Sequence, residues 1–312
     1  MKQNQYIYNV NYKDQEQALC TLEMKALFGE IHSEKVFVST LEINPSSSVY
    51  MKNRLEILVK KDTFEEIVAY IQEVGFSAND FIVRYNPLVK DDPYIKKGKQ
   101  LSKEIGLLIN GFPSFQDPKE KLGVSFFENQ WYFGYLHEND LNWKKHKNKP
   151  HSYSSSLGIN LAKALINIAG NGDLTKKIID PCCGVGTVLL EGLIAGYDIV
   201  GWELNYKIAE NARKNIEYFN YDTQITTGDI QDVVTYYDAA IIDLPYGNFS
   251  RTDAEDQLMI IRNAHRIADK VVIVSSEDIR ELLVEERMNI VESCKVDKGV
   301  RGNFARYVWV CT

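Results

Sequence analysis

The sequence has few cysteines and no long apolar run. Its five cysteines are scattered apart from one adjacent pair, at Cys20, Cys182, Cys183, Cys294 and Cys311, and no C-x-x-C spacing occurs. That absence argues against a zinc ribbon or a redox couple. No apolar run approaches the roughly 20 residues of a membrane span, and Met1–Gln5 leads into no signal-peptide stretch. We expect a cytoplasmic protein with reduced thiols and no membrane partner.

An excess of basic charge is also absent. The formal net charge of −7 argues against nucleic acid as a partner, because phosphate binding depends on lysine and arginine. The acidic excess lies in residues 151–312, with 16 basic and 23 acidic residues, whereas residues 1–150 hold 20 of each. Lysines of the first part gather in two clusters, namely Lys90, Lys96, Lys97, Lys99 and Lys103, then Lys144, Lys145, Lys147 and Lys149. Each cluster fits a solvated face, the commoner case, or a binding site.

Residues 157–312 alternate apolar helical segments with short β-branched strands, the pattern of a doubly wound α/β sheet. We predict seven strands, at 177–180, 198–203, 224–227, 238–243, 270–275, 289–296 and 305–311. The helices predicted with them are 157–169, 187–195, 206–219, 253–268 and 277–286. Because only a loop joins the last two strands, we expect a hairpin with an antiparallel last strand, as in class I methyltransferases and unlike dehydrogenases.

Residues 1–140 predict a separate α+β region. Their first elements are a strand at 6–10, a helix at 15–28, strands at 35–39 and 54–60, and a helix at 63–74, an order that resembles a ferredoxin-like split unit. A strand at 81–85, a helix at 97–108 and strands at 121–127 and 131–136 follow. The polar, lysine-rich stretch 141–156 predicts a linker.

A glycine loop, Asp180-Pro181-Cys182-Cys183-Gly184-Val185-Gly186-Thr187, follows the first strand of the second domain. Its two glycines allow a tight turn, and the next helix offers unpaired N–H groups at its start. A dinucleotide site would add a third glycine where Leu189 stands, and the acid Asp180 would repel a pyrophosphate. The same acid can accept from the ammonium of an amino-acid ligand, so the loop favours S-adenosylmethionine over NAD.

Two more acids end the next two strands. Glu203 stands twenty-three residues after Asp180, placed to accept from ribose hydroxyls, or else to sit at a helix N-terminus. Asp229 can bind an adenine amino group, or serve equally well as an N-cap or turn residue. The succession of acids at strand ends predicts a nucleoside cofactor site. Cys182 and Cys183 are expected to be small packing residues, since no basic partner is evident.

The strand at 238–243 runs into Asp243-Leu244-Pro245-Tyr246-Gly247. An exocyclic amine on a nucleobase is a weak nucleophile, because its lone pair is delocalised into the ring. Asp243 and the carbonyl of Leu244 would accept its two N–H bonds, while Pro245 would stiffen the turn and Tyr246 would stack on the base. Alone, the segment fits an ordinary turn. After the cofactor loop in the same sheet, it predicts methyl transfer to an exocyclic nitrogen.

Together with His151-Ser152-Tyr153 and the helix Leu161–Gly170, these motifs resemble those of THUMP-containing tRNA guanine-N2 methyltransferases. The resemblance is good over 140–312 and weaker before it, where it implies ferredoxin-like and THUMP-like domains that grip the acceptor end of tRNA. It implies a catalytic motif of Asp243, Leu244, Pro245 and Tyr246. Around S-adenosylmethionine it implies Tyr153, Ser154, Asp180, Pro181, Cys182, Gly184, Gly186, Thr187, Glu203, Leu204, Asp229 and Ile230.

Two positions depart from the family pattern. Leu244 stands where proline is usual, and because only its carbonyl is needed, we expect the chemistry to persist with a looser loop. Lys163 replaces a common arginine in the preceding helix, which concerns a helix contact rather than catalysis.

The resulting hypothesis is an S-adenosylmethionine-dependent RNA methyltransferase that modifies guanine N2 in tRNA, without an obligatory metal. An rRNA guanine-N2, DNA amino- or protein-glutamine methyltransferase would use the same motif, and the lysine-bearing N-terminal region favours RNA. A non-catalytic RNA-binding adaptor with this fold would fail to bind the cofactor. An NAD oxidoreductase is disfavoured by the missing third glycine. The oligomeric state stays open.

Overall fold

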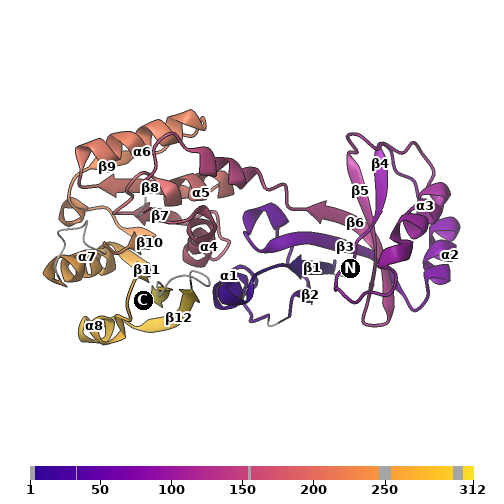
Figure 1. Ribbon diagram of the computed structural model, residues 1–312, viewed down its shortest axis with the longest axis horizontal. Helices are drawn as coiled ribbons and strands as arrows, with labels where there is room; N and C mark the ends of the chain where they lie inside the picture. Colours follow the sequence, from indigo (N-terminus) through magenta and orange to yellow (C-terminus); the bar gives the residue numbers. More distant parts are fainter. Residues whose placement is uncertain (1–3, 33, 154–155, 246–253, 298–304) are drawn as a thin grey trace. The chain divides into compact units, whose positions relative to one another are not determined.

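The chain divides into two compact units in the computed structural model, which describes residues 4–32, 34–153, 156–245, 254–297 and 305–312 (Figure 1). The first unit holds residues 1–11, 33–46 and 50–140, and the second holds residues 12–32, 47–49 and 141–312. This division differs from the linear one predicted from the sequence. Residues 12–32, expected in the N-terminal region, belong to the second unit.

The first unit is built on a mixed six-stranded sheet in the order β2-β1-β3-β6-β5-β4. Its elements are β1 Tyr6–Val10, β2 Val36–Ser39, β3 Met51–Lys61, α2 Phe64–Val74, β4 Phe81–Tyr85, α3 Gly98–Leu108, β5 Glu120–Phe127 and β6 Gln130–Glu138. β4 is parallel to β5, and the other neighbouring pairs are antiparallel. A ferredoxin-like unit would keep a crossover helix on this sheet after β1. Instead, β1 pairs directly and antiparallel with β2, the strand that follows the helix, and the helix itself belongs to the second unit.

Local sequence sets the bounds of α2. Thr63 and Glu66 form a reciprocal capping box at its start, and Gly75 takes a left-handed conformation with φ 59° at its end. The apolar face between these caps packs with α3 on the sheet, in a core that includes Phe64, Ile67, Ile71, Leu101, Ile105, Phe81 and Phe133.

The second unit contains a seven-stranded sheet in the order β12-β13-β11-β10-β7-β8-β9. Its strands are β7 Lys177–Asp180, β8 Asp198–Glu203, β9 Ile225–Thr227, β10 Tyr237–Asp243, β11 Ala268–Ser275, β12 Ile290–Asp297 and β13 Ala305–Cys311. β13 is antiparallel to both β11 and β12, whereas β7 to β11 run parallel. The predicted class I methyltransferase fold with its reversed last strand is confirmed.

Helices cover this sheet and bury its strands. They are α4 Ile159–Gly170, α5 Thr187–Ala195, α6 Tyr206–Tyr218, α7 Ala254–Ile267 and α8 Arg280–Glu285. α4 contacts α5 as well as β10 and β11, and α7 contacts β10 and β11. Because strand interiors such as Ile241, Ile242 and Ile273 are fully buried, polar groups gather where the strands end. Within the described residues, no helix combines the length and hydropathy needed to cross a membrane.

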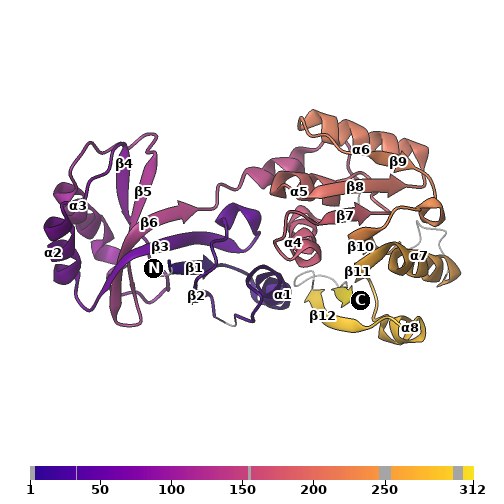
Figure 2. The ribbon, with the colours of Figure 1, turned by 180° about the vertical axis from the view of Figure 1, so that it is seen from behind.

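Helix α1, Gln17–Phe28, completes the second unit from far away in the sequence. It packs against α4 and β12, as the view from behind also shows (Figure 2). Its buried Glu23 accepts hydrogen bonds from Ser48 Oγ at 2.7 Å and from Asn167 Nδ2 of α4 at 2.6 Å. Lys25 forms an ion pair with Glu292 of β12. The contacts with Asn167 and Glu292 tie the early helix to elements that come more than a hundred residues later.

Candidate active site

A cavity of about 330 Å³ opens at the carboxyl ends of three parallel strands in the second unit. Asp180 ends β7, Glu203 ends β8 and Asp243 ends β10, and all three line the cavity. Parallel strands bring their carboxyl ends to one edge of a sheet, so acids distant in sequence meet there. The other sequence-predicted residues that line it are Tyr153, Cys182, Gly184, Thr187, Leu244 and Pro245.

The glycine loop turns sharply beneath this cavity. Gly184 and Gly186 have φ of 54° and 80°, a left-handed region that favours glycine. The N–H of Gly184 donates to Glu203 Oε2 at 3.0 Å, while Glu203 Oε1 accepts from the N–H of Asn205 at 2.8 Å. Glu203 therefore both lines the cavity and joins the glycine loop to the turn that precedes α6.

Helix α5 begins at the cavity, and a buried pair of side chains at its second turn holds it in place. Thr187 Oγ1 is buried and finds no hydrogen-bond partner among the described residues, which leaves a polar atom for a ligand. One turn further along α5, Glu191 Oε1 lies 2.8 Å from Nδ1 of His146, and both side chains are fully buried. This pair anchors α5 to the segment Asn142–Asn148.

The cavity concentrates negative charge. Burial raises the pKa of Asp180 well above its usual range, the N–H of Cys182 at 3.3 Å opposes this, and the charges of Asp243 and Glu203 raise the pKa further. Burial also raises the pKa of Glu203. Acids held together with raised pKa values are stabilised by a cationic ligand. The sulfonium and ammonium groups of S-adenosylmethionine supply such charge, so these residues fit that cofactor.

Several sequence-predicted residues lie elsewhere. Asp229 caps a short helical turn by accepting from the N–H of Gln231 at 2.9 Å, the structural role considered for it from the sequence. Leu204 is 70% exposed. Among the described residues, those predicted for the cofactor that do not line the cavity are Pro181, Gly186, Leu204, Asp229 and Ile230. Ser154 and Tyr246 lie outside the described residues.

Some lining residues were not predicted from the sequence as cofactor residues, namely Leu157, Cys183, Val185, Val188, Ile208 and Ile260. Most are apolar and sit on elements whose apolar residues elsewhere form the core, so no sequence signal separates the two groups. Leu157 directly follows the segment 153–156, for which a place near the methionine part of the cofactor is predicted, and could have been found by extending that segment by one residue. Burial raises the pKa of both Cys182 and Cys183, which keeps these thiols protonated beside the cavity.

Leu244 uses its backbone N–H, which proline lacks. That N–H donates to the carbonyl of Val274 at 2.9 Å, continuing the pairing of β10 with β11. The side chain is 2% exposed and packs in the main apolar cluster of the second unit with Ile242 and Ile260. These contacts fix Leu244, so its replacement of proline does not by itself free the loop at this position.

Replacing Leu244 with proline should therefore destabilise the second unit by roughly 2–4 kcal/mol, through an unpaired Val274 carbonyl and a poorly filled core. Urea unfolding followed by near-ultraviolet circular dichroism would measure the loss. Leu244→Met is the matched control, because it keeps the N–H and nearly the same volume. Equal unfolding midpoints for the two variants would contradict the assigned hydrogen bond.

A family model matches within this unit. Residues 147–300 match the family model UPF0020, described as an RMKL-like methyltransferase domain. The tRNA (guanine(10)-N2)-dimethyltransferase of Methanothermobacter thermautotrophicus is 29% identical over 48% of this chain and 47% of its own length. The enzyme of that name from Methanocaldococcus jannaschii is 25% identical over 60% of this chain and 59% of its own. This chain thus spans about half of the curated relatives it matches.

Two solved structures align with nearly the whole chain at low identity. TrmN from Thermus thermophilus is 15% identical with a TM-score of 0.47, over 98% of this chain and 99% of that one. SMU.472, a putative methyltransferase complexed with SAH, is 15% identical with a TM-score of 0.47, over 99% and 98%. The strand order and the reversed β13 are those predicted for a methyltransferase domain, and residues 147–300 of this unit match a model of such a domain.

Proposed function

We propose that this protein transfers a methyl group from S-adenosylmethionine to the exocyclic N2 of a guanine in tRNA. The observation that carries the proposal is the single cavity that brings Asp180, Glu203 and Asp243 together at adjoining strand ends. Asp180 and the glycine loop would hold the methionine part of the cofactor, and Glu203 would hold the ribose. The names of the matched relatives support guanine N2 and tRNA as the substrate class.

The cofactor supplies an electrophilic methyl group on its sulfonium sulfur. Asp243 accepts one N–H of the amine, and the Leu244 carbonyl accepts the other, so that the nitrogen lone pair is localised and aimed at the methyl carbon. As the new N–C bond forms, the S–C bond breaks and its electron pair stays on sulfur. Asp243 then takes the proton that the nitrogen loses. Tyr246 remains the proposed stacking ring.

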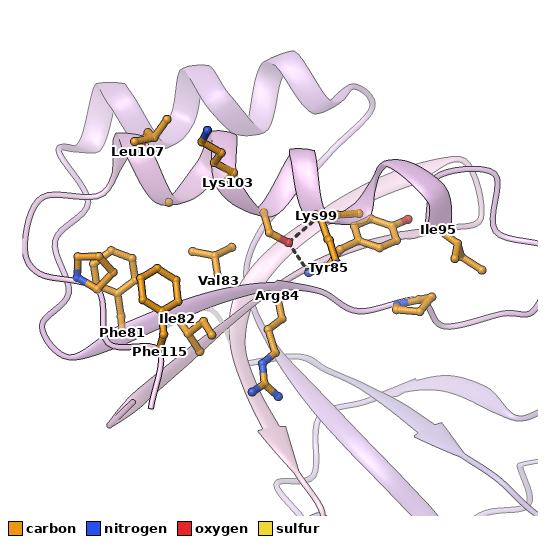
Figure 3. Close-up of a pocket in the computed structure, with 15 residues that line it drawn as sticks. Phe81, Ile82, Val83, Arg84, Tyr85, Ile95, Lys99, Lys103, Leu107 and Phe115 are labelled. Atoms are coloured by element: carbon orange, nitrogen blue, oxygen red, sulfur yellow. Dashed lines mark hydrogen bonds between the residues drawn. The ribbon is translucent and has the colours of Figure 1, made fainter. Parts of the chain in front are cut away.

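We also propose that the first unit is the RNA-binding region, with a THUMP-like role. A cavity of about 780 Å³ lies between β4 and α3 (Figure 3). Lys99 and Lys103 of α3 line it together with Phe115, whose side chain is 78% exposed. Exposed rings stack on unpaired bases, and ammonium groups bind phosphates, so this surface suits single-stranded RNA.

Charge reversal at Lys99 and Lys103 together should weaken RNA binding and lower the slope of log affinity against log salt by about two. The affinity of the purified protein for bulk tRNA, measured at several salt concentrations, would test this. The same reversal at Lys52 and Lys60, exposed on β3 and outside the cavity, is the control. An unchanged slope in the Lys99 and Lys103 variant would assign RNA contact to another surface.

One experiment tests the proposed activity and its substrate together. The protein is incubated with methyl-labelled cofactor and total RNA from a strain that lacks its gene, and the labelled nucleotide is mapped. Label at N2 of a guanine in tRNA is the expected result. Label found in DNA or protein alone would overturn the substrate.

Cofactor affinity should rise with pH and then level off. The pKa values of Asp180 and Glu203 are raised in the free protein, and a bound cation favours their ionised forms, so binding releases protons. Calorimetry from about pH 5 to about pH 8 would show the rise. S-adenosylhomocysteine, which lacks the sulfonium charge, should show a weaker dependence. Tighter binding of S-adenosylmethionine at the acidic end would contradict this electrostatic account.

A further inference from the structure

A second, smaller cavity of about 130 Å³ adjoins the first at the proposed catalytic segment. Leu244 and Pro245 line both cavities. Ser275, Ser276 and Glu277 come to the smaller one from the end of β11, and Gln257 comes from α7. The residues proposed to hold the reacting amine therefore stand between a cofactor-sized space and a space next to β11.

The backbone around the smaller cavity is held from two sides. Gln257 Nε2 donates to the Pro245 carbonyl at 2.8 Å. Beyond β11, Ser275 Oγ donates to the Glu277 carbonyl at 2.6 Å and accepts from Nε1 of the buried Trp309 at 2.9 Å. A framework anchored in the core thus sets where the Glu277 backbone lies relative to Leu244 and Pro245.

Glu277 is an exposed residue at the edge of this cavity. Among the described residues that line it, Glu277 is the only ionisable one. A carboxylate only accepts hydrogen bonds. Guanine carries an N1–H donor directly beside its exocyclic amine, whereas adenine and cytosine carry a ring nitrogen acceptor at the equivalent place. A carboxylate beside the amine site therefore attracts guanine and repels the other two bases.

We propose that the smaller cavity receives the Watson–Crick edge of the acceptor base, and that Glu277 determines its identity by accepting the N1–H of guanine. This assignment rests on the proposed function and deepens it. From the sequence, guanine was expected only by resemblance. The carboxylate of Glu277 would give a physical reason for that preference. Glu277 is a specificity-determining residue and takes no proton from the reacting nitrogen.

The test compares guanosine with 2,6-diaminopurine riboside, which keeps the N2 amine but has an acceptor at N1. A synthetic RNA carries one or the other at the position mapped above, and single-turnover methyl transfer is measured. The unaltered protein should prefer guanosine by about tenfold or more. Glu277→Gln should bring the ratio of rates close to one, because an amide can donate as well as accept. Asp278→Asn, next along the chain and outside the cavity, should keep the preference.

The outcomes separate this proposal from the one it rests on. Calorimetry should show equal affinity for S-adenosylmethionine in the unaltered protein and in Glu277→Gln, which establishes that the variant is folded. A Glu277→Gln protein that still prefers guanosine by the original factor would overturn the role of Glu277 alone. Cofactor binding without transfer to either RNA by the unaltered protein would overturn the proposed function, and this role with it.

Discussion

Asp243→Asn should lower the rate of methyl transfer by about 10²–10⁴-fold while cofactor binding persists. Asparagine keeps the size of the side chain at the end of β10 but can neither take a proton nor hold the amine through a negative charge. The substitution also favours the ionised form of Asp180, because the charge of Asp243 is one cause of the raised pKa of Asp180. The variant should thus separate chemistry from binding.

Single-turnover transfer to tRNA measures the first quantity, and calorimetry with S-adenosylmethionine measures the second. Asp232→Asn is the matched control, since Asp232 is an exposed acid of the same unit that does not line the cavity. Full transfer by the Asp243 variant would remove this residue from the mechanism. Loss of cofactor binding together with transfer would make it a cofactor-holding residue instead.

A fragment of residues 141–312 should not fold stably on its own. It contains the whole seven-stranded sheet but lacks α1, which packs against α4 and β12. The apolar residues that α1 buries are Leu19, Leu22, Met24, Leu27 and Phe28. At about 1.5–3 kcal/mol for each buried side chain, their loss approaches the whole stability of a typical domain.

Near-ultraviolet circular dichroism and thermal unfolding of the fragment would measure this, with the full chain for comparison. A synthetic peptide of residues 12–49, which carries α1 and its Ser48 contact, should restore a cooperative transition when added. A scrambled peptide of equal composition should not. Cooperative unfolding of the fragment alone, at the temperature of the full chain, would show that α1 is dispensable.

Much of the fold could be predicted because local patterns set it. The bounds of β4, α5 and β13 agree with the sequence prediction, since glycines, caps and alternating residues mark where each element begins and ends. α8 is shorter than predicted, at Arg280–Glu285, because the turn fixed by Ser275 and Glu277 occupies the residues before it. The partner of α1 could not be predicted. An apolar helix face shows that a surface is buried, but not against which element.

The candidate site also contains residues that the sequence predicted and residues that it could not. The three acids that line the cavity were predicted because each ends a parallel strand, and such ends converge. Asp229 had the same sequence context, and one of its carboxylate oxygens caps a turn, while its contact with adenine stays a prediction. Glu277 was not singled out from the sequence at all. The position of its backbone depends on Ser275, whose hydroxyl donates to the Glu277 carbonyl and accepts a hydrogen bond from Trp309. Trp309 lies thirty-four residues after Ser275, so no local pattern contains this contact.

The placement of α1 imposes an order on biosynthesis. The ion pair between Lys25 and Glu292 joins residues 267 positions apart, so α1 leaves the ribosome long before the strand that it contacts. Strands β2 to β6 of the first unit are translated in between and can pair while synthesis continues. The apolar face of α1 stays uncovered throughout that interval, which makes it a natural substrate for chaperones. Closure of the second unit, with its long-range contacts, is then a slow step of folding.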